Sequence, residues 1–314
     1  MTYRLTNLAA TAAAFLLSST GSCWAQHTWA LTAPQWNHSS DSDGLKIDKF
    51  AVAALPIYQS GYQWQGVELQ QQRYRQNGNA MEGQSLSYVA QKTDPLTGLG
   101  HSYKAGWNQG LNQSLLTGEF NWNQAYNEKL QWGVFANRDW VESFAALQNN
   151  VHYELIGGNV DYQVHPRLTT VASLAQTRFS DHHDRQQQRL RIVWDALPDH
   201  GVTLQWAYKH QLGEKTNTTP LYYNPERLDE SIAFVGWRKR IQGWQLYARA
   251  GWGSQKVADQ ESTPARVSEI NLTSPAYRDQ FLKIRIGSTQ TMGLNGPGYV
   301  YRYADVQWIF RLNR

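Results

Sequence analysis

Short segments in which apolar and polar side chains alternate recur along almost the whole chain. In Gly201–Glu214, the clearest of them, Leu204, Trp206 and Tyr208 hold every second position and polar residues lie mostly between them. A period of two places the two sets of side chains on opposite faces of a β-strand. The chain is therefore expected to be all-β. Alternation alone leaves two architectures open, a soluble sandwich and a transmembrane barrel that shows its apolar face to lipid.

The first residues have the composition of a secretory signal. Arg4 supplies a basic start, Leu8–Leu17 is a short apolar run, and small residues precede a cleavage point after Ala25. We expect residues 1–25 to be a signal peptide and residues 26–314 to form one domain. Cys23 is the only cysteine. A lipid anchor on Cys23 is the less favoured alternative, because the residues before it lack the expected leucine, and the mature chain is expected to hold no disulfide.

Composition favours the barrel over a soluble β-protein of the periplasm. The chain has 14 Trp and 17 Tyr, residues that suit the two belts where a barrel meets the membrane surfaces. Its mean hydropathy of −0.60 is compatible with a barrel, since only half of each strand faces lipid. No stretch reaches the roughly 18 apolar residues that a membrane helix needs.

The alternating runs and the Gly, Asn, Asp and Pro clusters between them predict a transmembrane antiparallel β-barrel of 16 strands, with 14 as the alternative. Turn clusters include Asp41–Gly44, Gln76–Asn79 and Asn295–Gly298. The expected strands are Thr28–Ser39, Lys46–Pro56, Gly61–Tyr74, Glu82–Lys92, Leu99–Gly110, Gln113–Tyr126, Glu128–Glu142, Val151–Val164, Arg167–Phe179, Gln186–Ala196, Gly201–Glu214, Glu230–Ile241, Gly243–Gln255, Tyr277–Thr289 and Gly298–Leu312, with Ala265–Leu272 as an additional strand that brings the number from fifteen to sixteen. Polar stretches such as Ser180–Arg185, Lys215–Leu228 and Lys256–Thr263 are interpreted as outer loops or as plugs folded inward.

Charge is distributed unevenly along the mature chain. Residues 26–184 hold 10 Lys and Arg against 14 Asp and Glu, a balance of −4, and residues 185–314 hold 18 against 11, a balance of +7. One arc of the barrel is thus expected to be acidic and the other basic. A cation on the lipid face costs about 2–4 kcal/mol at the membrane midplane, so the basic residues are assigned to the lumen.

The candidate pore-lining residues share the polar register of their strands, and they are Arg189, Arg191, Gln205, Lys209, Gln245, Tyr247, Arg249, Lys283, Arg285, Tyr301 and Tyr303. Two interpretations stay open. These charges are ordinary lumen groups paired across strands, or they belong to a lining where tyrosine rings stack on sugars and amides bond hydroxyls.

One region of the chain resembles a known family. Tyr222, Tyr223 and Pro225 precede a strand that ends near Trp237, and a turn and a Gly-rich strand ending at Gln255 follow. This succession resembles the closing part of the barrels of bacterial exopolysaccharide exporters, such as those of poly-N-acetylglucosamine and cellulose. The segment Ser40–Leu45 is similar to their first hairpin.

The resemblance implies a 16-stranded pore in the outer membrane of a Gram-negative bacterium that passes a polysaccharide outward, as in biofilm formation. In that family a scaffold of periplasmic helical repeats precedes the barrel, whereas here strands are expected soon after the signal peptide. The implied partners are outer-membrane lipid, the polysaccharide chain, a separate periplasmic helical-repeat scaffold and an inner-membrane synthase. The alternatives are a structural or receptor barrel closed by inward loops, and a lipid-modifying barrel enzyme.

The enzyme alternative depends on His38 and Ser40, which share one face of a strand. This spacing arises often by chance, and a polar rim is the favoured interpretation, so no catalytic residue is expected. Asp41 and Asp43 lack the glutamate that would complete an EF-hand, and His182 with His183 lies in a polar loop. We expect no metal site, no cofactor and no nucleic-acid partner, because no nucleotide fingerprint or basic run occurs.

Overall fold

The computed structural model describes residues 28–214, 220–275, 280–293 and 296–312, and the expected signal peptide lies outside these ranges. The strands are β1 (Thr28–Asp41), β2 (Lys46–Ser60), β3 (Gln63–Gln76), β4 (Asn79–Thr93), β5 (Gly100–Leu111), β6 (Gln113–Ala125), β7 (Leu130–Trp140), β8 (His152–His165), β9 (Leu168–Phe179), β10 (Asp184–Leu197), β11 (Val202–Gly213), β12 (Arg227–Ile241), β13 (Trp244–Val257), β14 (Thr263–Thr273), β15 (Gln280–Gly293) and β16 (Gly296–Leu312).

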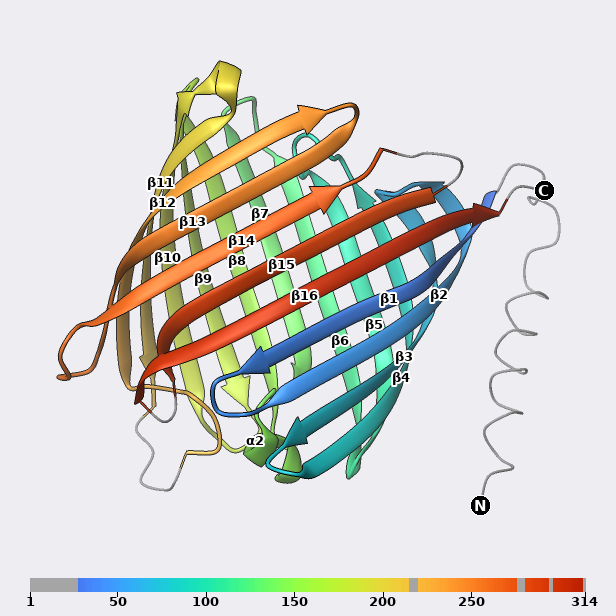
Figure 1. The fold of residues 1–314 in the computed structure, drawn as a ribbon, viewed down its shortest axis with the longest axis vertical. Coiled ribbons are helices and arrows are strands. Elements are labelled where there is room, and N and C mark those ends of the chain that lie inside the picture. Colours follow the sequence, from blue (N-terminus) through green and yellow to red (C-terminus); the bar gives the residue numbers. More distant parts are fainter. Residues whose placement is uncertain (1–27, 215–219, 276–279, 294–295, 313–314) are drawn as a thin grey trace.

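The strands form one closed antiparallel barrel in which each strand pairs with its sequence neighbours and β1 pairs with β16 (Figure 1). The expected all-β barrel of 16 strands is confirmed. The segment Ala265–Leu272, expected only as an additional strand, is the core of β14. The expected strand from Tyr277 begins in residues outside the described ranges, and β15 continues to Gly293.

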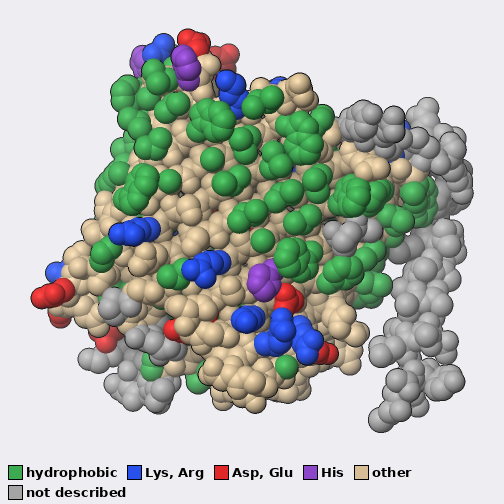
Figure 2. Space-filling view, in the orientation of Figure 1, with side chains coloured by type: hydrophobic (Ala, Val, Ile, Leu, Met, Phe, Trp, Pro, Cys, Tyr) green, Lys and Arg blue, Asp and Glu red, His purple; other side chains and the backbone are tan. Residues whose placement is uncertain are grey.

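The outer wall carries the apolar register. Val52, Leu69, Leu86, Trp107 and Leu116 pair successively across β2 to β6, and each is at least 40% exposed. Figure 2 shows such hydrophobic side chains spread over the face of the barrel. A soluble sandwich would bury this register between two sheets. Its exposure around a closed sheet is the arrangement of a barrel that faces lipid.

Most strands are longer than the roughly 9–11 residues that a crossing requires. The shortest, β7 and β14, have 11 residues, and β16 has 17. Figure 1 shows the strands running obliquely around the barrel, so each rises less per residue along the barrel axis. The extra residues carry several strands beyond the hydrophobic field of Figure 2.

Tight turns follow the expected chemistry. Asn77 and Gly78 join β3 to β4 with φ of 51° and 82°, and Gln242 and Gly243 join β12 to β13 with φ of 49° and 84°. Two successive positive φ values give the type I′ turn, whose twist matches that of the flanking strands.

The two ends of the barrel differ in their connections. The longest connections, residues 141–151 and 214–226, both lie at the end opposite to Thr28 and Leu312; we call it the loop end and the other the terminus end. Outer-membrane barrels have short periplasmic turns and longer extracellular loops. The loop end corresponds to the extracellular side of such barrels.

A short helix in the first of these connections was not expected from the sequence. The structure has α2 (Phe144–Gln148), together with a 3₁₀ turn, η2 (Pro198–His200). Among the described residues there is no helix of the length and hydrophobicity that a membrane crossing requires.

Candidate functional site

The inner face of the barrel can be identified from contacts that skip a strand. The Lys104 ammonium of β5 lies 2.6 Å from Glu68 of β3, and the Tyr303 hydroxyl of β16 donates to Glu269 of β14 at 2.6 Å. Such contacts over an intervening strand are made on the concave side of a closed sheet. The register that contains these residues is therefore the wall of the lumen.

The cations named from the sequence lie in this register. Arg189 and Arg191 of β10 border a cavity of about 500 Å³. Lys283 and Arg285 of β15 border a second cavity of about 490 Å³. Lys209 is paired directly opposite Arg189, so their side chains lie on the same face. The structure thus brings Arg189, Arg191 and Lys209 together on β10 and β11, and places Lys283 and Arg285 four strands further round.

Part of this basic wall is neutralised by a carboxylate that the sequence analysis did not single out. Glu269 of β14 is 7% exposed and accepts from the Arg285 guanidinium at 3.0 Å, while Arg249 of β13 lies 3.6 Å away. Asn271 also donates to Glu269. Arg249 and Arg285 are thus paired lumen charges, the first of the two open interpretations.

The amides and tyrosines lie on the same wall. Gln205 of β11 accepts from the Arg191 Nε at 3.1 Å and donates to the Tyr247 hydroxyl of β13 at 3.2 Å. Gln245 and Tyr247 are two residues apart and therefore share a face. The rings of Tyr301 and Tyr303 are 5.9 Å apart. A side chain at Gly287 would occupy the place of the Tyr303 ring, so the glycine lets this ring lie against the wall.

Acidic groups lie on the neighbouring strands β6 and β8 of the same wall. Asp161 of β8 borders the same cavity as Arg189 and Arg191, together with Asn159 and Phe135. Glu119 of β6 pairs with Lys104 of β5 and shares its inward register. The cavity therefore lies between carboxylate and amide groups of β6 to β8 and the guanidinium groups of β10.

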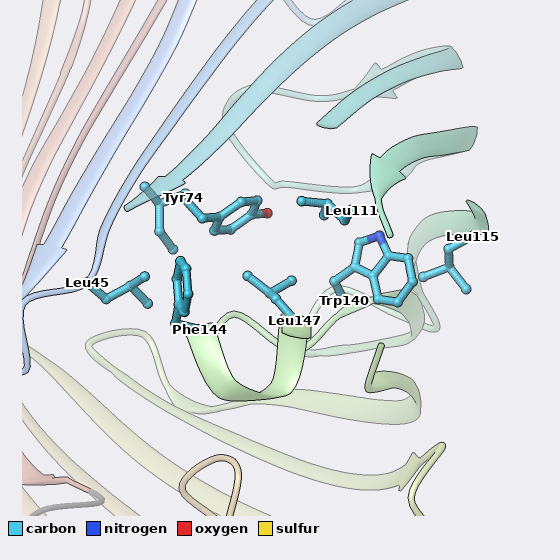
Figure 3. Close-up of a cluster of buried hydrophobic side chains, with 8 residues drawn as sticks. Leu45, Tyr74, Leu111, Leu115, Trp140, Phe144 and Leu147 are labelled. Carbon is cyan, nitrogen blue, oxygen red and sulfur yellow. The ribbon is translucent and has the colours of Figure 1, made fainter. Parts of the chain in front are cut away.

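At the loop end, α2 packs against the wall formed by β2 to β7. Ser143 caps the helix by accepting from the Ala146 amide at 3.1 Å. Phe144 and Leu147 point from the helix toward the strands, where Figure 3 shows both below Tyr74, with Leu147 beside Trp140. The whole buried cluster is Leu45, Ile47, Tyr74, Leu111, Leu115, Trp140, Phe144 and Leu147. Glu142, just before the helix, forms an ion pair with Lys49 of β2.

The segment that contains Tyr222, Tyr223 and Pro225 packs against α2 from the other side. The Tyr222 ring packs on Phe179 with a centroid separation of 4.5 Å, and its hydroxyl donates to Asp181 at 2.9 Å. Burial and this hydrogen bond raise the pKa of Tyr222 above its ordinary value of 10.0. Ser143 donates to the Leu221 carbonyl at 2.5 Å, which ties the two loops together.

Tyr223 and Pro225 complete this segment. Arg185 of β10 donates to the Tyr223 carbonyl at 2.7 Å and to the Asn224 side chain at 2.9 Å. Burial raises the pKa of the Tyr223 phenol to about 12. Pro225 follows half-buried beside Gly213, at the start of β12. Of the stretch Lys215–Leu228, residues 215–219 lie outside the described ranges, and 220–226 form part of the closure.

His38 and Ser40 lie on the outer wall rather than in the lumen. The His38 ring stacks on Trp36, which is 39% exposed, and its Nδ1 lies 2.6 Å from Asp48 of β2. No hydrogen bond joins Ser40 to His38 in the described part of β1, so a nucleophile–base pair is not assembled. Within the described ranges no group of three His, Cys, Asp or Glu side chains is placed to hold a metal ion.

The sequence matches no protein-family model and no curated protein. Similar solved structures include a bacterial polysaccharide outer-membrane secretin, with a TM-score of 0.67 at 12% identity over 91% of this chain and 98% of that one. They also include an anion-selective porin from Comamonas acidovorans, with a TM-score of 0.41 at 9% identity over 91% of this chain and 98% of the porin. The likeness to the secretin shows that the chain has the fold of an outer-membrane β-barrel.

Proposed function

We propose that this barrel is an outer-membrane pore through which an extracellular polysaccharide leaves the cell by passive translocation. The observation that carries the proposal is the inner wall from β10 to β16, where cations, amides and tyrosine rings are joined by hydrogen bonds beside the apolar cluster of Ile232, Phe234 and Ala265. Many weak contacts of this kind let a hydrated polymer slide, whereas one strong site would hold it.

Two further observations support the proposal. The similar secretin is described as a polysaccharide protein of the outer membrane, and its fold extends over 91% of this chain. The segment with Tyr222, Tyr223 and Pro225 resembles an element of the exporters, and here it contributes to the mouth of the barrel. Polymer synthesis by an inner-membrane synthase would drive the movement, with a separate periplasmic helical-repeat protein as guide.

The test is channel recording in planar bilayers with the polysaccharide of the host strain added on the terminus side. We expect an ohmic current with transient blocks whose frequency rises with polymer concentration. Replacing both Tyr301 and Tyr303 by Ser should shorten the blocks, because the stacking surface is lost. Tyr88 on the outer wall is the matched control, and Tyr88→Ser should change nothing. A conducting barrel that no polysaccharide blocks would contradict polymer export.

The mouth favours a second candidate, a structural or receptor barrel that stays closed. Its support is the cluster around α2, in which Leu147 is fully buried. A receptor of this kind would be silent in the same recordings. Conduction therefore decides between a pore and a closed barrel, and blocking by polymer then tests the substrate.

A further inference from the structure

Basic side chains gather on the outer wall at the loop end of β16, β1, β2 and β3. Arg302 pairs with Ser40, Ser40 with Lys46, and Lys46 with Arg75, so these residues form one row across four adjacent strands. Arg73 lies in the next row, opposite Asp48. We call Lys46, Arg73, Arg75 and Arg302 the outer basic patch, and all four are exposed.

Internal ion pairs neutralise only half of this patch. Arg75 lies 2.6 Å from Asp48, and Arg73 lies 3.2 Å from Glu82. Within the described ranges neither Lys46 nor Arg302 has an ion pair. Four cations against two carboxylates leave an excess of two positive charges. Side-chain pairs of like charge on neighbouring strands destabilise a sheet. An external anion bound between Lys46 and Arg75 would relieve this repulsion.

A row of outer-wall residues at the loop end of β7 to β10 carries no such excess of positive charge. There Arg138 pairs with Glu154, Glu154 with Arg178, and Arg178 with Asp184. The signs alternate along that row and sum to zero. The outer basic patch is therefore a feature of one side of the barrel, not a general property of its rim.

The position of the patch selects the kind of anion. Trp36 and Phe50 pair with each other two rows below it, and they are 39% and 47% exposed among the apolar side chains of the wall. Figure 2 shows basic side chains beside a histidine and acidic groups at the lower edge of the hydrophobic field. A group bound there would have its acyl chains along the apolar wall and its negative charge at the level of the patch.

We propose that the outer basic patch binds the phosphorylated headgroup of a glycolipid of the outer leaflet. The loop end corresponds to the extracellular side, where the outer leaflet of a Gram-negative membrane consists of such lipids. Arg302 and Lys46 supply the unpaired charges, and the Ser40 hydroxyl between them is a further donor to a phosphate oxygen. This site is separate from the lumen and does not depend on what passes through it.

The test is native mass spectrometry of the detergent-purified protein titrated with bisphosphorylated lipid A, dephosphorylated lipid A or phosphatidylglycerol. We expect the first lipid to bind and the other two to bind at least about tenfold more weakly. Replacing both Lys46 and Arg302 by Gln should lower the affinity for bisphosphorylated lipid A roughly 10- to 30-fold, because a basic residue at a charged membrane surface contributes about fivefold. Arg178→Gln, in the balanced row, is the matched control and should bind as the unaltered protein does.

Each opposite outcome overturns the proposal. Undiminished binding by the double variant would show that the patch is not the site. An equal loss of affinity in Arg178→Gln would show that binding depends on the overall charge of the protein and not on the patch. Equal binding of phosphatidylglycerol would show that the patch has no preference for a glycolipid. Heat-dependent mobility in gel electrophoresis establishes that each variant is a folded barrel, so that a loss of binding reports on the site.

Discussion

The mouth and the midsection of the barrel interior are lined by opposite kinds of side chain. At the mouth, Phe144 and Leu147 of α2 fill the space between strands with buried apolar groups. In the midsection, Arg191 and Tyr247 each hydrogen-bond Gln205, and Arg191 borders a cavity of about 500 Å³. A barrel of 16 strands is wide enough for an aqueous channel. The comparison teaches that the apolar side chains at the mouth are supplied by two loops, whereas the polar side chains along the lumen are supplied by the strands of the wall.

The sharpest way to break this comparison is to remove α2. Replacing residues 143–149 with a Gly-Ser segment of equal length should raise single-channel conductance at least about twofold, because the wall alone leaves an open lumen. Planar-bilayer recording measures the change. The same replacement of residues 258–262, in another loop-end connection, should leave conductance unaltered. If the variant without α2 conducts no better, the restriction lies in the wall.

The second prediction concerns the charges of the wall. Replacing Arg249 and Arg285 by Glu should shift the barrel toward cations, by about tenfold in permeability ratio, because Glu269 then faces two further carboxylates. Reversal potentials under a salt gradient measure this ratio. Arg266 lies exposed on the outer wall of the same strand as Glu269, and Arg266→Glu should have no effect. An unchanged ratio would place Arg249 and Arg285 away from the conducting path.

The third prediction concerns packing at the mouth. Leu147→Ala should destabilise the closed loop by about 2–5 kcal/mol, the range for truncating a fully buried leucine. Hydrogen exchange of residues 141–151 reports this local opening. Leu174, 65% exposed on the outer wall, is the control, since Leu174→Ala leaves a space that lipid can fill. Equal exchange in both variants would contradict a packed plug.

The smallest effect is expected at Tyr222. Tyr222→Phe removes the hydrogen bond to Asp181 and should cost about 0.5–1.5 kcal/mol in the closure of the loop. The folded pKa of Tyr222 is raised, so its contribution is complete below pH 10 and is lost as the pH rises above that value. Protease cleavage of the loop measured from pH 8 to 11 should therefore accelerate at the alkaline end, and less steeply in Tyr222→Phe. Identical profiles would show that the phenol does not hold the loop.

Strand number and order were accessible from the sequence because each strand repeats the same physical pattern. Lipid on one side and water on the other impose a period of two, and turn residues such as Asn77 and Gly78 mark the ends. The register of Arg189, Gln205 and Tyr247 follows from the same period. The hydrogen-bonding partners of these residues do not follow from that period, since the pairing of strands is fixed by the whole barrel.

Glu269 and α2 show where the sequence was not sufficient. Glu269 bonds Tyr303, a residue 34 positions away, and no local signal announces that contact. The helix has five residues, too few for a helical period to be visible. The local signal was Ser143 ahead of Ala145, Ala146 and Leu147, a capping residue before good helix formers.

The central claim is that the polar register is enclosed and the apolar register meets lipid. Single cysteines introduced by Ser173→Cys and Leu174→Cys, with Cys23 replaced by Ala, test it at two adjacent positions of β9. A small hydrophilic, membrane-impermeant maleimide should label position 173 in outer-membrane vesicles and leave position 174 unlabelled until detergent is added. Labelling of position 174 with protection of position 173 would contradict the account.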